Sequence, residues 1–181
     1  MSATTPGREE RAPAGELLRQ HRVERLLYLE ALCLDRRDWD RWLDLYHPEA
    51  VIWMPAWISE ETLASDPEVE LALIHCAGRE DLADRVFRIQ TGDSAASTPL
   101  ARSCHVIGNV LVLGEDAGTI EVSAAWTVHQ YGEVKGPRVH GGRYEYELLK
   151  DPADGARLLI GRKKIVFLND AVDVPIDLHN V

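Results

Sequence analysis

The spacing of hydrophobic residues changes near Arg102, and this change limits the folds that the chain can adopt. Before this point apolar residues recur every three or four positions, which is typical of amphipathic helices. After it they recur every second position, which is typical of strands with two distinct faces. Because helices come first and strands follow in one block, the sequence predicts an α+β fold with the helices packed on one face of a sheet.

The first half predicts two longer helices, each with an apolar stripe along one face. One begins near Glu16, and the other ends at Gly92, which is a typical C-terminal cap. Glu30 lies beside the first stripe, either as a hydrogen-bonded acid at its edge or as a buried functional carboxylate. Residues 70–77 fit a strand or a helix equally well. The stripes are Val23, Leu27, Ala31 and Leu34 in the first of these helices and Leu82, Val86 and Ile89 in the other.

A short tryptophan-rich stretch between these two helices ends at a proline. Trp39, Trp42, Leu43 and Tyr46 share one face of a predicted second helix. Pro48 cannot continue this helix, and the apolar residues after it favour a strand. The sequence therefore predicts that a sheet begins here and covers the tryptophan face.

The second half predicts a series of antiparallel strands. The alternation is clearest in residues 119–131, where every second side chain is apolar and the others are mostly polar. Segments rich in turn residues separate this run from its neighbours at 115–118, 132–137 and 151–155. Short connections of this kind indicate strands that pair with their sequence neighbours.

Length and composition indicate one domain. The 181 residues are 45% hydrophobic, which is enough for one core. Residues 1–15 contain almost no large apolar side chain and are expected to form a flexible N-terminal arm, with the single domain spanning residues 16–181. The three cysteines have no paired spacing, so reduced and mostly buried thiols are expected.

The charge of the chain argues against nucleic acid and membrane partners. The formal net charge is −10, and Lys and Arg are scattered among more numerous acids instead of forming a basic stripe. No apolar run approaches the length of a membrane span, and the N-terminus is too polar for a signal peptide. We therefore expect a cytoplasmic protein that binds neither nucleic acid nor membrane.

The seven histidines raise the question of a metal site. No HExxH, His-x-His, Rieske-type Cys-x-His or glycine-rich phosphate loop occurs. His129 and His140 flank a predicted hairpin loop, either as metal ligands or, as we favour, as a solvated pair. The motifs thus predict no metal-binding or cofactor-binding residue in this chain.

Acid–base chemistry in a pocket between the helices and the sheet is an alternative hypothesis. Carboxylates, phenols and an imidazole could act there as general base, hydrogen-bond donor and proton shuttle. The simpler interpretation, which we favour, is that the aspartates cap the second helix while the other groups lie at the edge of the core. The candidates are Asp35, Asp38, Asp40, Tyr28, Tyr46 and His105.

Three runs of the chain together resemble a known family. They are LDRRDWDRWLDLYHPEAVIWMPAW, SDPEVELALIHCAGREDLADRVFRIQTG and TPLARSCHVIGNVLV, and the combination of WMPAW, DRVFRI and SCHVIGNV is specific. They are similar to the small (beta) subunit of aromatic-ring-hydroxylating dioxygenases, particularly the benzoate and anthranilate type. The similarity extends from about Glu16 to the final DLHNV.

The resemblance implies a cystatin-like cone, as in nuclear transport factor and ketosteroid isomerase, in which a curved antiparallel sheet wraps N-terminal helices. It implies a non-catalytic structural subunit that assembles with a large (alpha) oxygenase subunit into a hexamer of three alpha and three beta chains. The Rieske [2Fe-2S] cluster and the mononuclear iron are then expected in the alpha subunit, which receives electrons from a reductase. The expected reaction is dihydroxylation of an aromatic carboxylate in aromatic hydrocarbon catabolism.

The resemblance also suggests where the subunits meet. Trp53, Trp57, Arg85 and Arg88 become candidate interface residues, because aromatic and arginine side chains often anchor interfaces. The two tryptophans are equally compatible with the core. Two other functions remain as alternatives: a ligand-binding cone without activity, and a free-standing cone-fold lyase or isomerase that uses Asp40, His105 and Tyr28 or Tyr46.

Overall fold

The computed structural model describes residues 14–94, 99–133, 135–169 and 175–181. Three helices and eight strands occur in these ranges, followed by a short 3-10 helix. The predicted N-terminal arm, residues 1–15, lies outside the described residues except for its last two, which already belong to the first helix. The elements are α1 (Ala14–Arg36), α2 (Trp39–Leu43), β1 (Tyr46–Pro55), β2 (Trp57–Ser59), β3 (Thr62–Leu63), β4 (Ala72–Ala77), α3 (Arg79–Thr91), β5 (Arg102–Asp116), β6 (Thr119–Gly132), β7 (Gly136–Lys150), β8 (Leu158–Phe167) and η1 (Leu178–Asn180).

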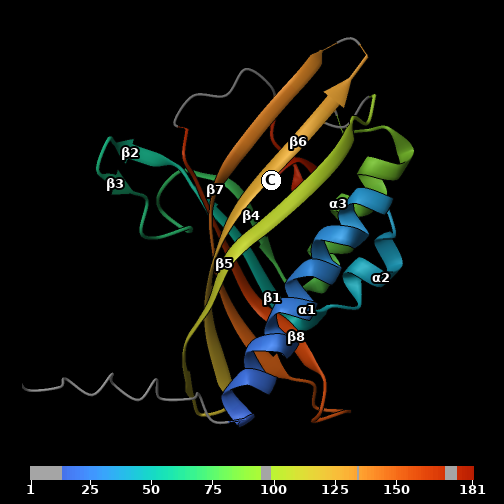
Figure 1. The fold of residues 1–181 in the computed structure, drawn as a ribbon. Coiled ribbons are helices and arrows are strands. Elements are labelled where there is room, and N and C mark those ends of the chain that lie inside the picture. Colours follow the sequence, from blue (N-terminus) through green and yellow to red (C-terminus); the bar gives the residue numbers. More distant parts are fainter. Residues whose placement is uncertain (1–13, 95–98, 134, 170–174) are drawn as a thin grey trace, which may run out of the picture.

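The helices cover one face of the sheet, as the sequence predicts (Figure 1). The apolar stripe of α1 is buried, with Val23 and Leu27 fully inaccessible to solvent. In α3 the predicted stripe is buried as well, and Gly92 adopts the left-handed conformation that ends the helix, with a φ of 80°. The two periodic stripes therefore identified both long helices correctly.

The six-stranded sheet has the order β4-β1-β8-β7-β6-β5. Strands β5 to β8 pair with their sequence neighbours in the antiparallel sense, which confirms the predicted meander. The exception is the pairing of β1 with β8, which is parallel and places Tyr46 opposite Ile160. The curved sheet wraps the N-terminal helices, so the predicted α+β cone is confirmed (Figure 1), with one parallel pair among antiparallel ones.

Beyond the long periodic elements, two local assignments needed the structure. The second helix is shorter than its apolar spacing suggested, because Tyr46 already belongs to β1 and not to α2. The ambiguous run at residues 70–77 contains a strand, β4, which pairs with β1 and places Ile52 opposite Cys76. In both places a strand pairing decides the conformation, between β1 and β8 at Tyr46 and between β1 and β4 at residues 72–77.

The sheet packs tightly where β7 passes between β6 and β8. Gly142 lies opposite Trp126 on β6 and Phe167 on β8. A Cβ atom at Gly142 would clash with the carbonyl oxygen of Val166 and lie 3.2 Å from the Cα of Phe167. Only glycine therefore permits the close approach of β7 and β8 at this point.

Candidate functional site

A fully buried carboxylate, Glu30 on α1, is bound by three side chains of the sheet. Its Oε1 accepts hydrogen bonds from the Tyr46 hydroxyl at 2.5 Å and from Lys163 Nζ at 2.6 Å. Its Oε2 accepts a hydrogen bond from the Tyr146 hydroxyl at 2.9 Å. The ammonium group of Lys163 also lies 4.0 Å from the ring centroid of Tyr144. Glu30 is thus a buried carboxylate, and its bonds tie α1 to β1, β7 and β8.

The electrostatics of this cluster favour an ion pair. Burial by itself raises the pKa of Glu30, but the charge of Lys163 and three hydrogen bonds outweigh burial and hold the pKa below its ordinary value. Burial lowers the pKa of Lys163, and attraction by Glu30 offsets part of that effect. Burial and the nearby Glu30 charge raise the pKa of Tyr46 and Tyr146 well above the usual value. At neutral pH the phenols therefore donate hydrogen bonds to an ionised carboxylate.

A second polar cluster joins the end of α1 to β5. Asp35 Oδ1 lies 2.6 Å from His105 Nδ1 and accepts a hydrogen bond from Ser103 Oγ at 2.9 Å. Asp35 Oδ2 accepts the backbone N–H of His105, also at 2.9 Å. Burial raises the pKa of Asp35, but the hydrogen bonds from His105 and Ser103 outweigh it, so that the pKa is lowered. The carboxylate orients the imidazole and holds the helix end against the strand.

The arrangement does not assemble the alternative catalytic group. Of the six acid–base candidates, the structure brings together Asp35 and His105, whereas Tyr46 binds Glu30. Asp40 and Tyr28 are exposed, and Asp40 lines a shallow surface hollow with residues of α2 and α3. The hypothesis that Asp40, His105 and a tyrosine form a lyase or isomerase site is therefore not favoured, because Asp40 is exposed and His105 binds Asp35 instead.

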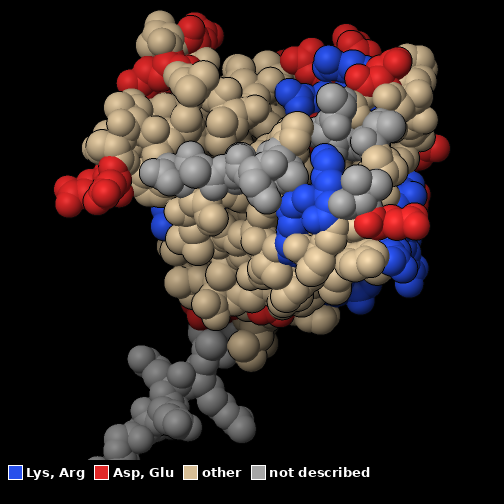
Figure 2. Space-filling view, turned by 90° about the horizontal axis from the view of Figure 1, so that it is seen from above, with Lys and Arg blue, Asp and Glu red and all other residues tan. Residues whose placement is uncertain are grey.

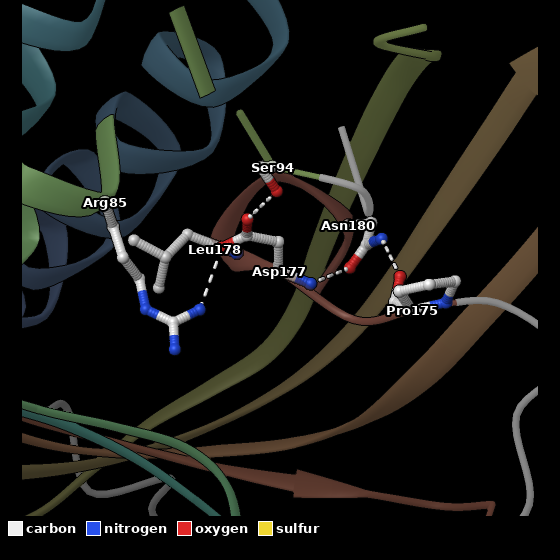
Figure 3. A network of polar contacts seen from close by, with 6 residues as sticks. All are labelled: Arg85, Ser94, Pro175, Asp177, Leu178 and Asn180. Atoms are coloured by element: carbon white, nitrogen blue, oxygen red, sulfur yellow. Dashed lines mark hydrogen bonds and ion pairs between the residues drawn. The ribbon is translucent and has the colours of Figure 1, made fainter. Parts of the chain in front are cut away.

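A C-terminal segment, residues 175–181, lies between the sheet and α3 (Figure 3). Asp177 accepts hydrogen bonds from Arg85 Nη1 at 3.0 Å and from Ser94 Oγ at 2.8 Å. The side-chain amide of Asn180 donates to the carbonyl of Pro175 at 3.1 Å, and the backbone carbonyl oxygen of Asn180 lies 3.1 Å from His140 Nδ1. Because Leu178 and Val181 are also buried in the core, this segment is an integral part of the fold.

Acidification is expected to weaken the fold through His179 in this segment. Burial lowers the pKa of His179 to about 4, and the opposing effect of Asp177 offsets burial only in part. The unfolded chain binds this proton near pH 6.5, whereas the folded chain keeps a neutral imidazole until about pH 4. The free energy of unfolding should therefore fall by up to about 3 kcal/mol as the pH drops through this window.

Urea denaturation across that pH range would measure this loss. The variant His179→Gln has no titrating group at this position, so its stability should change less with pH than that of the wild type. Equal pH dependence in the two proteins would show that His179 titrates normally in the folded chain.

The remaining histidine and cysteine candidates are dispersed. His129 and His140 occupy neighbouring pairs of the β6–β7 ladder but face opposite sides of the sheet, with His129 exposed and His140 buried. Cys33 and Cys76 are buried thiols, whereas Cys104 is exposed. Among the described residues no three His, Cys, Asp or Glu side chains lie close enough to hold a metal ion. No helix in the described ranges is long and apolar enough to cross a membrane.

The four candidate interface residues have different environments. Trp53 is 3% exposed on β1, and the charged groups of Arg162 and Lys164 lie 5.9 Å and 5.2 Å from its ring centroid. Trp57 is half-buried and donates its indole N–H to the carbonyl of Phe167 at 2.7 Å. On α3, Arg85 is half-buried against Asp177 and Arg88 is exposed.

These features define an α+β cone whose inward-facing acids and bases chiefly bind one another. Its sequence matches the family described as ring hydroxylating beta subunit over residues 29–174, and the chain belongs to that family. It is 38% identical over 159 residues to the 2-halobenzoate 1,2-dioxygenase small subunit of Burkholderia cepacia, covering 88% of this chain and 94% of that one. It is 37% identical over 160 residues to the anthranilate 1,2-dioxygenase small subunit of Acinetobacter baylyi, covering 88% and 95%.

A solved structure shows the same fold. The beta subunit of benzoate 1,2-dioxygenase from Burkholderia mallei superposes with a TM-score of 0.69 at 32% sequence identity. The superposition covers 88% of this chain and 95% of that one. The resemblance seen in the sequence is therefore confirmed, and so is the role of small subunit in a ring-hydroxylating dioxygenase.

Proposed function

We propose that this chain is the structural subunit of a dioxygenase that dihydroxylates an aromatic carboxylate similar to benzoate or anthranilate. The observation that carries the proposal is the identity of 37–38% to small subunits of 2-halobenzoate and anthranilate dioxygenases over most of each chain. Such a reaction would begin the catabolism of an aromatic compound in the cytoplasm. The bonds of Glu30 to Lys163 and two tyrosines support a structural role, because they commit this buried carboxylate to holding the cone together.

The catalytic centres belong, in this proposal, to the large oxygenase subunit. A Rieske [2Fe-2S] cluster there would accept electrons from a reductase, and a mononuclear iron would activate oxygen. Three large and three small subunits would form the complex. The small subunit would contribute the surfaces on which the large subunits are arranged.

The four candidate interface residues divide into two groups by burial. Trp57 and Arg88 retain accessible surface and are proposed to contact a neighbouring subunit directly. Trp53 and Arg85 are proposed to support that contact from beneath. Trp53 lies under Arg162 and Lys164, and Arg85 is held by Asp177.

Co-expression with the large oxygenase subunit of the same operon tests this function. We expect the two chains to co-purify through a tag on the large subunit and to elute as one species, whose mass by light scattering equals three copies of each. Oxygen consumption with benzoate or anthranilate, measured with the reductase and its electron donor present, should require that complex. A large subunit that is fully active without ever binding this chain would contradict the proposal.

A further inference from the structure

One segment, residues 57–71, leaves the main sheet and folds as a separate hairpin, which we call the acidic arm. Strands β2 and β3 pair Trp57 with Leu63 and Ser59 with Thr62. Figure 1 shows this hairpin projecting on the side of the molecule opposite to the helices. The arm therefore leaves the main sheet but stays in contact with the body of the cone through Trp57, whose indole N–H donates to the carbonyl of Phe167.

Hydrogen bonds give the arm a defined conformation. The Glu70 carboxylate accepts the backbone N–H groups of Ser65 and Asp66, the latter at 3.0 Å. The Asp66 carboxylate accepts the N–H of Glu68 at 2.9 Å. At the base of the arm, Ala56 N–H donates to the carbonyl of Leu71 at 3.1 Å. The arm is thus preorganised, and a partner would not have to order it on binding.

The arm presents large apolar side chains to solvent. Ile58 is 59% exposed, Val69 is 79% exposed and Leu71 is 72% exposed. Single exposed apolar residues are common on protein surfaces, but three on one short, projecting and ordered segment are typical of a contact site. The exposed apolar side chains of this arm would therefore fit an apolar recess on a partner.

The charge of the arm indicates which side chains would surround that recess. Residues 57–71 contain five acidic side chains and no Lys or Arg, and they are Glu60, Glu61, Asp66, Glu68 and Glu70. Figure 2 shows acidic side chains with little Lys or Arg at the left of the view, the side on which the hairpin lies in Figure 1, whereas the larger groups of Lys and Arg lie to the right, with further acids among them. A complementary surface would surround its apolar recess with basic side chains.

The net charge of the chain disfavours a second copy as the partner of the arm. The chain has 30 acidic and 20 basic residues, so two copies repel each other overall. Several of its basic groups also already pair with acids of the same chain, including Arg85 with Asp177, Arg143 with Glu145 and Arg162 with Glu147. The charge balance favours a different, more basic surface as the binding site of the arm.

We propose that the acidic arm docks into an apolar recess rimmed by Lys and Arg on the large oxygenase subunit. The inference rests on the proposed function, which supplies that subunit as the partner. The apolar residues Ile58, Val69 and Leu71 enter the recess, and the surrounding carboxylates pair with its basic rim. Trp57 anchors the arm during docking, because its indole N–H is hydrogen-bonded to the carbonyl of Phe167 in the body of the cone.

Binding of purified variants to the tagged, immobilised large subunit tests the apolar part of the proposal. The double variant Val69→Ser, Leu71→Ser should bind at least about tenfold more weakly than the wild type, because two anchor side chains are lost. The matched control is Leu17→Ser, which removes an apolar side chain that is 61% exposed on α1 and should bind as the wild type does. Both variants should unfold at the wild-type temperature, since the replaced side chains lie mostly in solvent.

Association kinetics test the electrostatic part. The double variant Glu61→Lys, Glu68→Lys should associate more slowly and lose much of the salt dependence of its association rate. The control Glu16→Lys, Glu133→Lys makes the same change in net charge at two exposed acids outside the arm. Equal slowing in this control would contradict a specific role for the arm.

The outcomes separate this inference from the function on which it rests. Wild-type binding that both arm variants leave unchanged would overturn the docking role and leave the subunit function standing. Failure of the wild type to bind any large subunit would overturn both. An arm variant that changes only the self-association of the isolated chain would identify a second copy as the occupant and overturn the proposal.

Discussion

Replacing Lys163 with methionine is expected to lower the free energy of unfolding by about 3–5 kcal/mol. The substitution removes the cation that lies 2.6 Å from Glu30 and leaves a carboxylate whose side chain is 2% exposed. Two tyrosine hydroxyls would still bind that carboxylate, but they do not neutralise its charge. Chemical denaturation monitored by tryptophan fluorescence would measure the loss.

The adjacent lysine provides a matched control for this prediction. Lys164 points to the opposite face of the same strand, is a quarter exposed and lies 3.4 Å from Glu145. Because surface ion pairs contribute little, Lys164→Met should cost less than about 1 kcal/mol. Adding Glu30→Gln to Lys163→Met removes the stranded charge, so the double variant should be more stable than Lys163→Met alone. A double variant less stable than that would contradict the ion pair.

Introducing a single methyl group at Gly142 is expected to cost about 3 kcal/mol or more. The Cβ of an alanine would meet the Val166 carbonyl oxygen and the Cα of Phe167, which are main-chain atoms that cannot rotate away. Strands β7 and β8 would have to separate, and the backbone hydrogen bonds between them would weaken. Thermal unfolding followed by circular dichroism would record a lower midpoint for Gly142→Ala.

Gly108→Ala tests whether steric contact is the cause. Gly108 also lies within the sheet, on β5, but a Cβ there would have no atom within 4 Å. This variant should therefore be about as stable as the wild type or slightly more stable, because alanine restricts the unfolded chain. A loss at Gly108 as large as that at Gly142 would mean that steric contact between β7 and β8 is not the cause.

Local periodicity was sufficient for the elements whose burial is one-sided. The stripes of α1 and α3 and the alternation in β6 each repeat over several turns or pairs, so a single residue does not change the interpretation. It was insufficient at Tyr46, which continues the helical spacing of Trp39 and Trp42 although its backbone is in β1. There a long-range partner, β8, determines the conformation.

The buried polar contacts could not be predicted from the sequence, because they join residues that are distant along the chain. Glu30 and Lys163 are 133 positions apart, and Lys163 lies between two other basic residues in the sequence, so only its inward-facing position on β8 distinguishes it. Asp35 and His105 are 70 positions apart, and three aspartates near the end of α1 were equally plausible partners for the histidine. Only the way in which α1 packs against β5 shows that Asp35 is the partner of His105.

The parallel pairing of β1 with β8 also has a consequence for synthesis on the ribosome. Strand β1 pairs with β4 on one side early in translation, but its other edge stays unpaired until residues 158–167 have been made. Chains with such long-range contacts fold slowly, and an unpaired strand edge promotes aggregation. Most of the polypeptide must therefore be synthesised before the core can close, so a chaperone that shields β1 should increase the yield of folded subunit more than one acting on β6 or β7.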